Sequence, residues 1–93
     1  MNMPSHHNVA LVTGGSGGLG KVVCRRLLSE GYRVAMADID SAALGRAAVE
    51  LDDPDLVTCE LDVTQSADFK AVLAVVTRRW GGIGVLVNNA ALT

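Results

Sequence analysis

Residues 13–20 of this 93-residue chain read Thr13-Gly14-Gly15-Ser16-Gly17-Gly18-Leu19-Gly20. They follow the apolar run Val9-Ala10-Leu11-Val12 and precede a helical pattern, which predicts a turn from a strand into a helix. Glycines in such a turn let a ligand approach the backbone without meeting a Cβ. The first N–H groups of the helix have no acceptor within the helix and attract an anion. The stretch therefore predicts a site for a pyrophosphate group.

Three glycines of this stretch fit a G-x-G-x-x-G pattern, which a flexible glycine-serine loop would also satisfy. The surroundings favour a dinucleotide site, because a strand precedes the loop, an amphipathic helix follows it, and Asp38 ends the next predicted strand. A carboxylate at that position accepts hydrogen bonds from the adenosine ribose diol. Asp38 is the weaker candidate for capping the next helix, since Asp40 and Ser41 already supply that cap.

Further along the chain, short apolar or β-branched runs at 33–38, 56–61 and 85–88 predict parallel strands that are covered on both faces. Three helical patterns lie between the strands. Their apolar faces are Leu19, Val22, Val23 and Leu27; Leu44, Ala47, Ala48 and Leu51; and Phe69, Leu73, Val76 and Trp80. The order is β-α-β-α-β-α-β, and right-handed crossovers then give an α/β, doubly wound, Rossmann-type parallel sheet with the strand order 3-2-1-4.

Composition excludes several classes of function. The chain is 49% hydrophobic and 19% charged with a net charge of −2, so we expect no nucleic-acid partner. It has neither an apolar run of membrane-spanning length nor a signal peptide, so we expect a cytoplasmic protein with no membrane contact. Cys24 and Cys59 are expected to be small buried hydrophobes without a disulfide. His6 and His7 are expected in a frayed leader, and no metal site is predicted.

The predicted fourth strand has the apolar composition of an inner strand, although only one neighbour is available to it. A complete dinucleotide fold has two β-α-β-α-β halves. We therefore expect residues 1–93 to be the N-terminal part of a single NAD(P)-binding Rossmann domain, which a further C-terminal half or a second chain completes. Alone, this chain is not expected to form a stable, soluble monomer.

Taken together, the motifs resemble those of one family, the short-chain dehydrogenases/reductases in their classical form, over Val9 to Ala91. The matches to the family are Thr13, Gly14, Gly18 and Gly20 for T-G-x-x-x-G-x-G, Asp38 after the second strand, Asp62-Val63 after the third, and Asn88-Asn89-Ala90 on the fourth. Ala91 stands where the family usually has Gly, and Gly84 where an Asp commonly stands. We interpret both departures as tolerated variation.

The residues of the glycine stretch have expected roles that follow from their position. Ser16 and Leu19 would offer hydrogen bonds to ribose and pyrophosphate, and Gly14, Gly18 and Gly20 would permit the approach of the cofactor.

The segments that end the third and fourth strands are also expected to contact the cofactor. The resemblance implies that Asp62 holds the adenine amino group and that Val63 packs on the adenine, although by spacing alone Asp62 could equally cap the third helix. It also implies that Asn89 and Ala90 face the cofactor ribose, while Asn88 ties the fourth strand to its neighbours.

In this family a Tyr exchanges a proton, assisted by a Lys in a Y-x-x-x-K helix and by an upstream Ser, while the nicotinamide exchanges a hydride. The single Tyr of this chain, Tyr32, is followed four positions later by Met36, so we assign no catalytic residue and expect the isolated chain to be inactive. The resemblance implies that the complete protein is an NAD(P)-dependent oxidoreductase for an alcohol or carbonyl substrate. It further implies a homo-oligomer. The substrate itself cannot be inferred from this part of the architecture.

NAD is the expected cofactor rather than NADP. Asp38 would repel a 2′-phosphate, and neither Gly17 nor Ile39 supplies a cation. Two alternatives remain at this stage. One is an extended epimerase or dehydratase of the same superfamily, because T-G-x-x-G-x-x-G also fits the loop. The other is a non-catalytic NAD-binding module.

Overall fold

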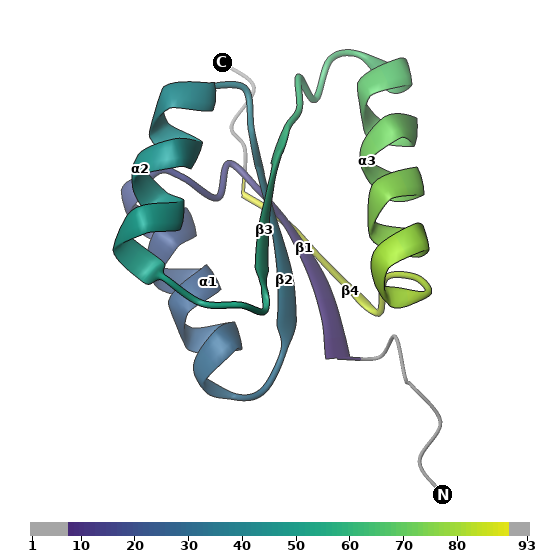
Figure 1. Ribbon diagram of the computed structural model, residues 1–93. Helices are drawn as coiled ribbons and strands as arrows, with labels where there is room; N and C mark the ends of the chain where they lie inside the picture. Colours follow the sequence, from purple (N-terminus) through teal and green to yellow (C-terminus); the bar gives the residue numbers. More distant parts are fainter. Residues whose placement is uncertain (1–7, 90–93) are drawn as a thin grey trace, which may run out of the picture.

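The computed structural model describes residues 8–89, and Figure 1 shows a single parallel sheet between two layers of helices. The elements in chain order are β1 (Val9–Thr13), α1 (Gly18–Ser29), β2 (Arg33–Asp38), α2 (Ser41–Leu51), β3 (Leu56–Glu60), α3 (Ser66–Trp80) and β4 (Val85–Asn88). The strand order is β3-β2-β1-β4, and every neighbouring pair is parallel. Both the predicted fold class and the predicted strand order are therefore confirmed.

Helices α1 and α2 cover one face of the sheet and α3 covers the other (Figure 1). The side chains of β1 and β2 alternate between these two faces, as side chains of a strand must. On the α3 face, Leu11 and Ala35 pack with Val76; on the opposite face, Val12 and Met36 pack with Cys24. The two central strands are consequently buried on both sides, which explains their continuous apolar sequences.

The register of the sheet brings the carboxyl ends of the strands to one edge. Thr13, the last residue of β1, is in register with Ala37 of β2 and with Asn88 of β4. Asp38 is in register with Glu60, the last residue of β3. The segments that follow these strands therefore meet at the same edge, where parallel α/β sheets bind their ligands.

The predicted apolar face of α1 is partly wrong. Leu19 is 68% exposed and Val22 is 59% exposed, whereas Gly20 and Cys24 are the buried residues of this helix. The physical reason is that Gly20, which has no side chain, lets the first turn of α1 lie directly against the loop at Gly15. This contact rotates the helix away from the face that the apolar pattern suggested.

Glycines with positive φ follow two of the helices. Gly31 (φ +90°) follows α1, and Gly81 (φ +91°) caps α3 in the left-handed conformation. At the start of α2, Asp40 Oδ1 accepts a hydrogen bond from Ala43 N at 3.0 Å, so Asp40 is the cap, as expected. The third strand ends at Glu60, one residue earlier than predicted, although the Leu61 N–H still donates to the Asp38 carbonyl at 2.9 Å.

Cys24 is buried and Cys59 is partly buried, both are free thiols, and they pack in different core clusters. Burial raises the pKa of Cys24 to about 12, and it also raises the pKa of Cys59. A thiol with a raised pKa stays protonated near neutral pH and is a poor nucleophile. Both cysteines therefore serve as small apolar side chains.

Candidate functional site

The glycine loop connects β1 to α1 with very little space around its backbone. Gly14 has φ +64°, a conformation that favours glycine. A Cβ on Gly15 would lie 2.6 Å from Met36 Cγ, and a Cβ on Gly20 would lie 2.6 Å from Gly15 Cα. These glycines are therefore required by the packing of the protein itself.

Gly18 differs from these positions. A Cβ added there would meet no protein atom within 4 Å, and its φ does not lie in the left-handed region. The packing of the described residues thus gives no reason for a glycine at this position. An absent side chain on an open surface at the start of a helix leaves room for a ligand, which agrees with the predicted approach of a pyrophosphate.

Helix α1 begins without a side-chain cap. Its N-cap is Gly17, no acidic residue stands in its first turn, and the first backbone N–H to find a carbonyl is that of Lys21, which donates to Gly17 O at 2.8 Å. Within residues 8–89, the amides of Gly18, Leu19 and Gly20 have no backbone acceptor. Three unpaired N–H groups and the positive end of the helix dipole favour an anion at this point.

Asp38 lies beside this loop and is held by several donors. Its Oδ2 accepts hydrogen bonds from Ser16 Oγ at 2.6 Å and from Ser16 N at 3.3 Å, and its Oδ1 accepts from Asp40 N at 3.1 Å. Partial burial pushes the pKa of Asp38 upward, but the hydrogen bonds from Ser16, Asp40 and Ile39 outweigh it and leave the pKa below its usual value. The carboxylate is therefore charged at neutral pH and fixed in orientation.

A second set of hydrogen bonds joins the ends of β1 and β4. Thr13 Oγ1 donates to Asn88 Oδ1 at 3.0 Å and accepts from Asn89 N at 3.1 Å. Asn89 Nδ2 in turn donates to the Gly14 carbonyl at 3.3 Å. Asn88 thus ties β4 to β1, in line with its expected role, and Asn89 lies directly against the glycine loop.

Asp62 follows β3 at the same edge of the sheet. Its Oδ1 accepts from Thr64 Oγ1 at 2.6 Å and Thr64 N at 2.9 Å, and these hydrogen bonds lower the pKa of the Asp62 carboxyl. The N-cap of α3 is Gln65, so Asp62 does not cap that helix. Asp62 N donates to Asp68 Oδ2 of the first turn of α3 at 3.2 Å, which fixes the position of the turn.

Val63 is partly buried and packs against the core cluster on the α3 side of the sheet. Its side chain therefore contributes to the protein core. Whether it also contacts an adenine stays a prediction.

Most predicted site residues come together around the ends of β1, β2 and β4, namely Gly14, Ser16, Gly18, Leu19, Gly20, Asp38 and Asn89. The predicted contact at Ala90 lies outside the described residues. Sequence reasoning missed the part played by Thr13, which joins the two strand ends. The sequence did carry a signal for this role, because Thr13 is a polar residue at the end of an otherwise apolar strand. A hydroxyl that is buried there needs hydrogen-bond partners.

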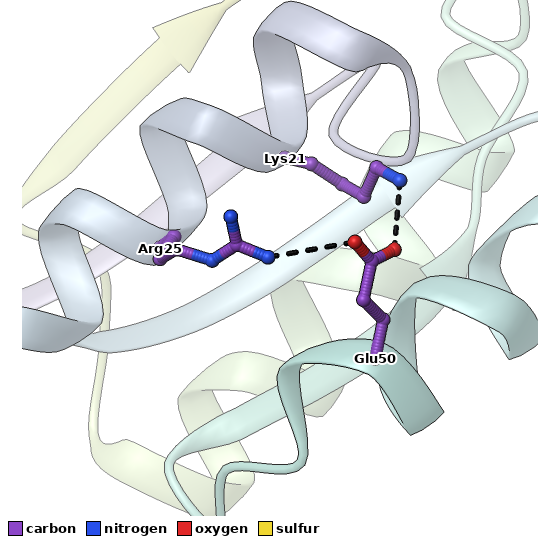
Figure 2. Close-up of polar contacts among 3 residues, drawn as sticks. All are labelled: Lys21, Arg25 and Glu50. Atoms are coloured by element: carbon purple, nitrogen blue, oxygen red, sulfur yellow. Dashed lines mark hydrogen bonds and ion pairs between the residues drawn. The ribbon is translucent and has the colours of Figure 1, made fainter.

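Lys21 and Arg25 are the first cations after the glycine loop in the sequence, and both face α2 (Figure 2). Lys21 Nζ lies 2.8 Å from Glu50 Oε2, and an Arg25 guanidinium nitrogen lies 3.5 Å from Glu50 Oε1. The hydrogen bond and the positive charge of Lys21, together with those of Arg25, lower the pKa of the Glu50 carboxyl. These cations are therefore engaged by a carboxylate of the neighbouring helix.

Other kinds of site find no support in residues 8–89. No group of three His, Cys, Asp or Glu side chains in this range is arranged to hold a metal ion. The helices in the same range are too short or too polar to cross a bilayer.

The sequence matches a model of the family described as short chain dehydrogenase over residues 8–93. The 3-beta-hydroxysteroid dehydrogenase of Comamonas testosteroni is 46% identical over 84 residues, which are 90% of this chain and 33% of that enzyme. A crystal structure of an actinorhodin polyketide ketoreductase with NADPH superposes with a TM-score of 0.87 at 34% identity, covering 97% of this chain and 36% of the other.

A 3-ketoacyl-(acyl-carrier-protein) reductase from Brucella melitensis, crystallised with NADH, superposes with a TM-score of 0.78 at 28% identity. That match covers 84% of this chain and 32% of the other. The chain therefore spans about one third of the length of these relatives. The two related structures carry different nicotinamide cofactors, one NADH and one NADPH.

Proposed function

Because this chain belongs to the short-chain dehydrogenase family, we propose that it supplies the cofactor-binding part of an NAD(P)-dependent oxidoreductase. The reaction would be the transfer of a hydride between the nicotinamide and an alcohol or carbonyl substrate. Residues 1–93 would form the N-terminal part of a single NAD(P)-binding domain. The proposal rests on three features of the described residues that lie at one edge of the sheet. They are three backbone amides without a backbone acceptor, a carboxylate fixed by hydrogen bonds, and a glycine with open space at the position of a Cβ.

The residues at this edge fit a dinucleotide in chemistry as well as in arrangement. The N–H groups of Gly18, Leu19 and Gly20 suit a pyrophosphate, and the Asp38 carboxylate suits the diol of the adenosine ribose. Asn89, which lies against Gly14, would bound the site toward the nicotinamide half. The nicotinamide, when bound, supplies the hydride chemistry, while these residues bind and orient it.

We propose NAD as the preferred cofactor. The Asp38 carboxylate is charged, so a 2′-phosphate placed beside it would meet like-charge repulsion. Ile39, the next residue, is 63% exposed and carries no cation, and Lys21 is paired with Glu50. Asp38 therefore offers the ribose diol an acceptor, whereas neither Ile39 nor Lys21 offers a 2′-phosphate a free cation.

The observations favour an oxidoreductase over an epimerase or dehydratase and over a non-catalytic binding module. The relatives compared above bear the names of dehydrogenases and reductases, which favours this reading over an epimerase or dehydratase. A non-catalytic binding module would show the same cofactor site without turnover. Since we assign no catalytic residue within this chain, we expect residues 1–93 alone to bind the dinucleotide without oxidising or reducing a substrate.

The test is calorimetric titration of the complete protein with NADH and with NADPH. NADH should bind at least about tenfold more tightly, which corresponds to about 1.4 kcal/mol. The double variant Asp38→Ala/Ile39→Arg should move the preference toward NADPH. The control Asp40→Asn removes a neighbouring charge but keeps the helix cap, so it should leave the preference unchanged. Tighter binding of NADPH would refute the NAD preference, and no binding of either nucleotide would refute the proposed function.

A further inference from the structure

The hydrogen-bond donor of the Ser16 side chain is already used within the protein. Ser16 is only 9% exposed, and its Oγ lies 2.6 Å from Asp38 Oδ2, which also accepts from the Ser16 backbone N–H at 3.3 Å. The hydroxyl and the backbone N–H of Ser16 therefore donate to the same carboxylate oxygen of Asp38. A short hydrogen bond from a hydroxyl to a carboxylate is among the stronger hydrogen bonds in proteins.

The negative charge of Asp38 has no cation beside it. No ion pair to Asp38 occurs in the part of the chain that the structure describes. Its charged neighbours are also acidic, because Glu60 is in register with it on β3 and Asp40 lies two residues further on. Asp40 directs its carboxylate to the Ala43 amide. Asp38 is therefore held in place by hydrogen-bond donors rather than by an ion pair, and Ser16 contributes two of them.

We propose that Ser16 is a positioning residue that acts through Asp38. Its buried hydroxyl fixes the Asp38 carboxylate in the orientation that accepts a ribose diol and repels a 2′-phosphate. The inference rests on the proposed function of this edge of the sheet. It assigns to Ser16 a part in discriminating between NAD and NADP that is separate from any direct contact with the cofactor.

The consequence is a particular pattern of affinities. Without the Ser16 hydroxyl, the carboxylate rotates more freely, so the ribose diol loses an ordered acceptor and the 2′-phosphate meets a less fixed charge. The affinity for NADH falls by about tenfold, the typical effect of losing a hydrogen bond to a charged group. The affinity for NADPH changes little, so the ratio of the two dissociation constants shrinks.

A double-mutant cycle tests this inference with four proteins: the wild type, Ser16→Ala, Asp38→Ala, which removes the acceptor, and the double variant. Each is titrated with NADH and with NADPH, and Ser29→Ala, which removes an exposed hydroxyl from α1, is the matched control. We expect Ser16→Ala to lower the preference for NADH when Asp38 is present and to have no further effect in the Asp38→Ala background. The control should behave as the wild type does.

The results that overturn the inference are specific. An unchanged ratio in Ser16→Ala, an equal loss of affinity for both nucleotides, or an effect that persists in the Asp38→Ala background would each contradict an action through Asp38. A measurement without cofactor separates this failure from that of the proposed function. By carbon NMR of the free protein, the pKa of Asp38 should be higher in Ser16→Ala than in the wild type, and an unchanged pKa would refute the inference even if NADH binds.

Discussion

The hydroxyl of Thr13 at the end of β1 donates a hydrogen bond to Asn88 Oδ1 at the end of β4, with an Oγ1 to Oδ1 distance of 3.0 Å. The two residues are 75 positions apart in the sequence and in register in the sheet. The same hydroxyl oxygen accepts from Asn89 N at 3.1 Å. A single side chain therefore joins the end of β1, where the glycine loop begins, to the end of β4.

Thr13→Val tests this connection. Valine has the shape of threonine but leaves the Asn89 N–H and the Asn88 side chain without this partner. Thr13 is 2% exposed, so water cannot fully replace it, and the free energy of unfolding should fall by about 1–3 kcal/mol. Urea denaturation measures the loss. Thr58→Val, at an exposed position on β3, is the control and should change stability little; equal stabilities of the two variants would contradict the assigned role.

Gly18→Val distinguishes an effect on protein stability from an effect on cofactor binding. An added Cβ at this position meets no atom of the described residues within 4 Å, so thermal unfolding should remain cooperative and close to that of the wild type. NADH affinity should fall by more than about tenfold because the side chain would occupy the path of the pyrophosphate. Gly45→Val, at an equally open position of α2, should keep both properties. NADH binding by Gly18→Val within about a factor of two of the wild type would contradict a steric role.

Leu86 on β4 is expected to make the 93-residue chain associate when it is expressed alone. The strand pairs only with β1 among the described residues, and Leu86 is 53% exposed. An uncovered apolar edge strand recruits further strands. Size-exclusion chromatography with light scattering should show oligomers or aggregates, and Leu86→Lys should reduce them.

The control for this experiment is Val49→Lys, which places the same charge at an 81% exposed position of α2. It should leave association unchanged, because no strand edge lies at that position. A monodisperse wild-type chain with a sharp unfolding transition would show instead that residues 1–93 are self-sufficient. That outcome would favour the binding-module alternative.

Cys24 should make the protein less stable at alkaline pH. Burial raises the pKa of its thiol from 9.0 to about 12, so the unfolded chain loses the proton at a lower pH than the folded protein does. The free energy of unfolding is unaffected below the unfolded pKa and falls above it, by about 1.4 kcal/mol per pH unit until the folded pKa is reached. Urea denaturation from pH 8 upward should show this slope in Cys59→Ala, which keeps Cys24, and a smaller one in Cys24→Ala, where only the raised pKa of Cys59 acts; both thiols contribute in the wild type. A profile that Cys24→Ala leaves unchanged would disprove the assignment.

The order of the elements and the order of the strands could be predicted from the sequence, because both follow from local rules. Short continuous apolar runs identify the buried strands and period-3.6 apolar patterns identify the helices, and the handedness of parallel crossovers then leaves one strand order. The glycine loop and Asp38 were identified in the same way. Each lies at the end of a strand, and the ends of parallel strands share one edge.

Only the tertiary structure decided which groups contact one another at that edge. Ser16 lies 22 positions from Asp38, and Thr13 lies 75 positions from Asn88, so neither hydrogen bond has a periodic signature in the sequence. A contact made only in the folded protein also decides which face of α1 is exposed. The close approach of Gly20 to Gly15 sets the rotation of the helix, which the apolar pattern alone left ambiguous. Local sequence determines which elements form, whereas contacts between distant residues determine how their side chains are oriented and charged.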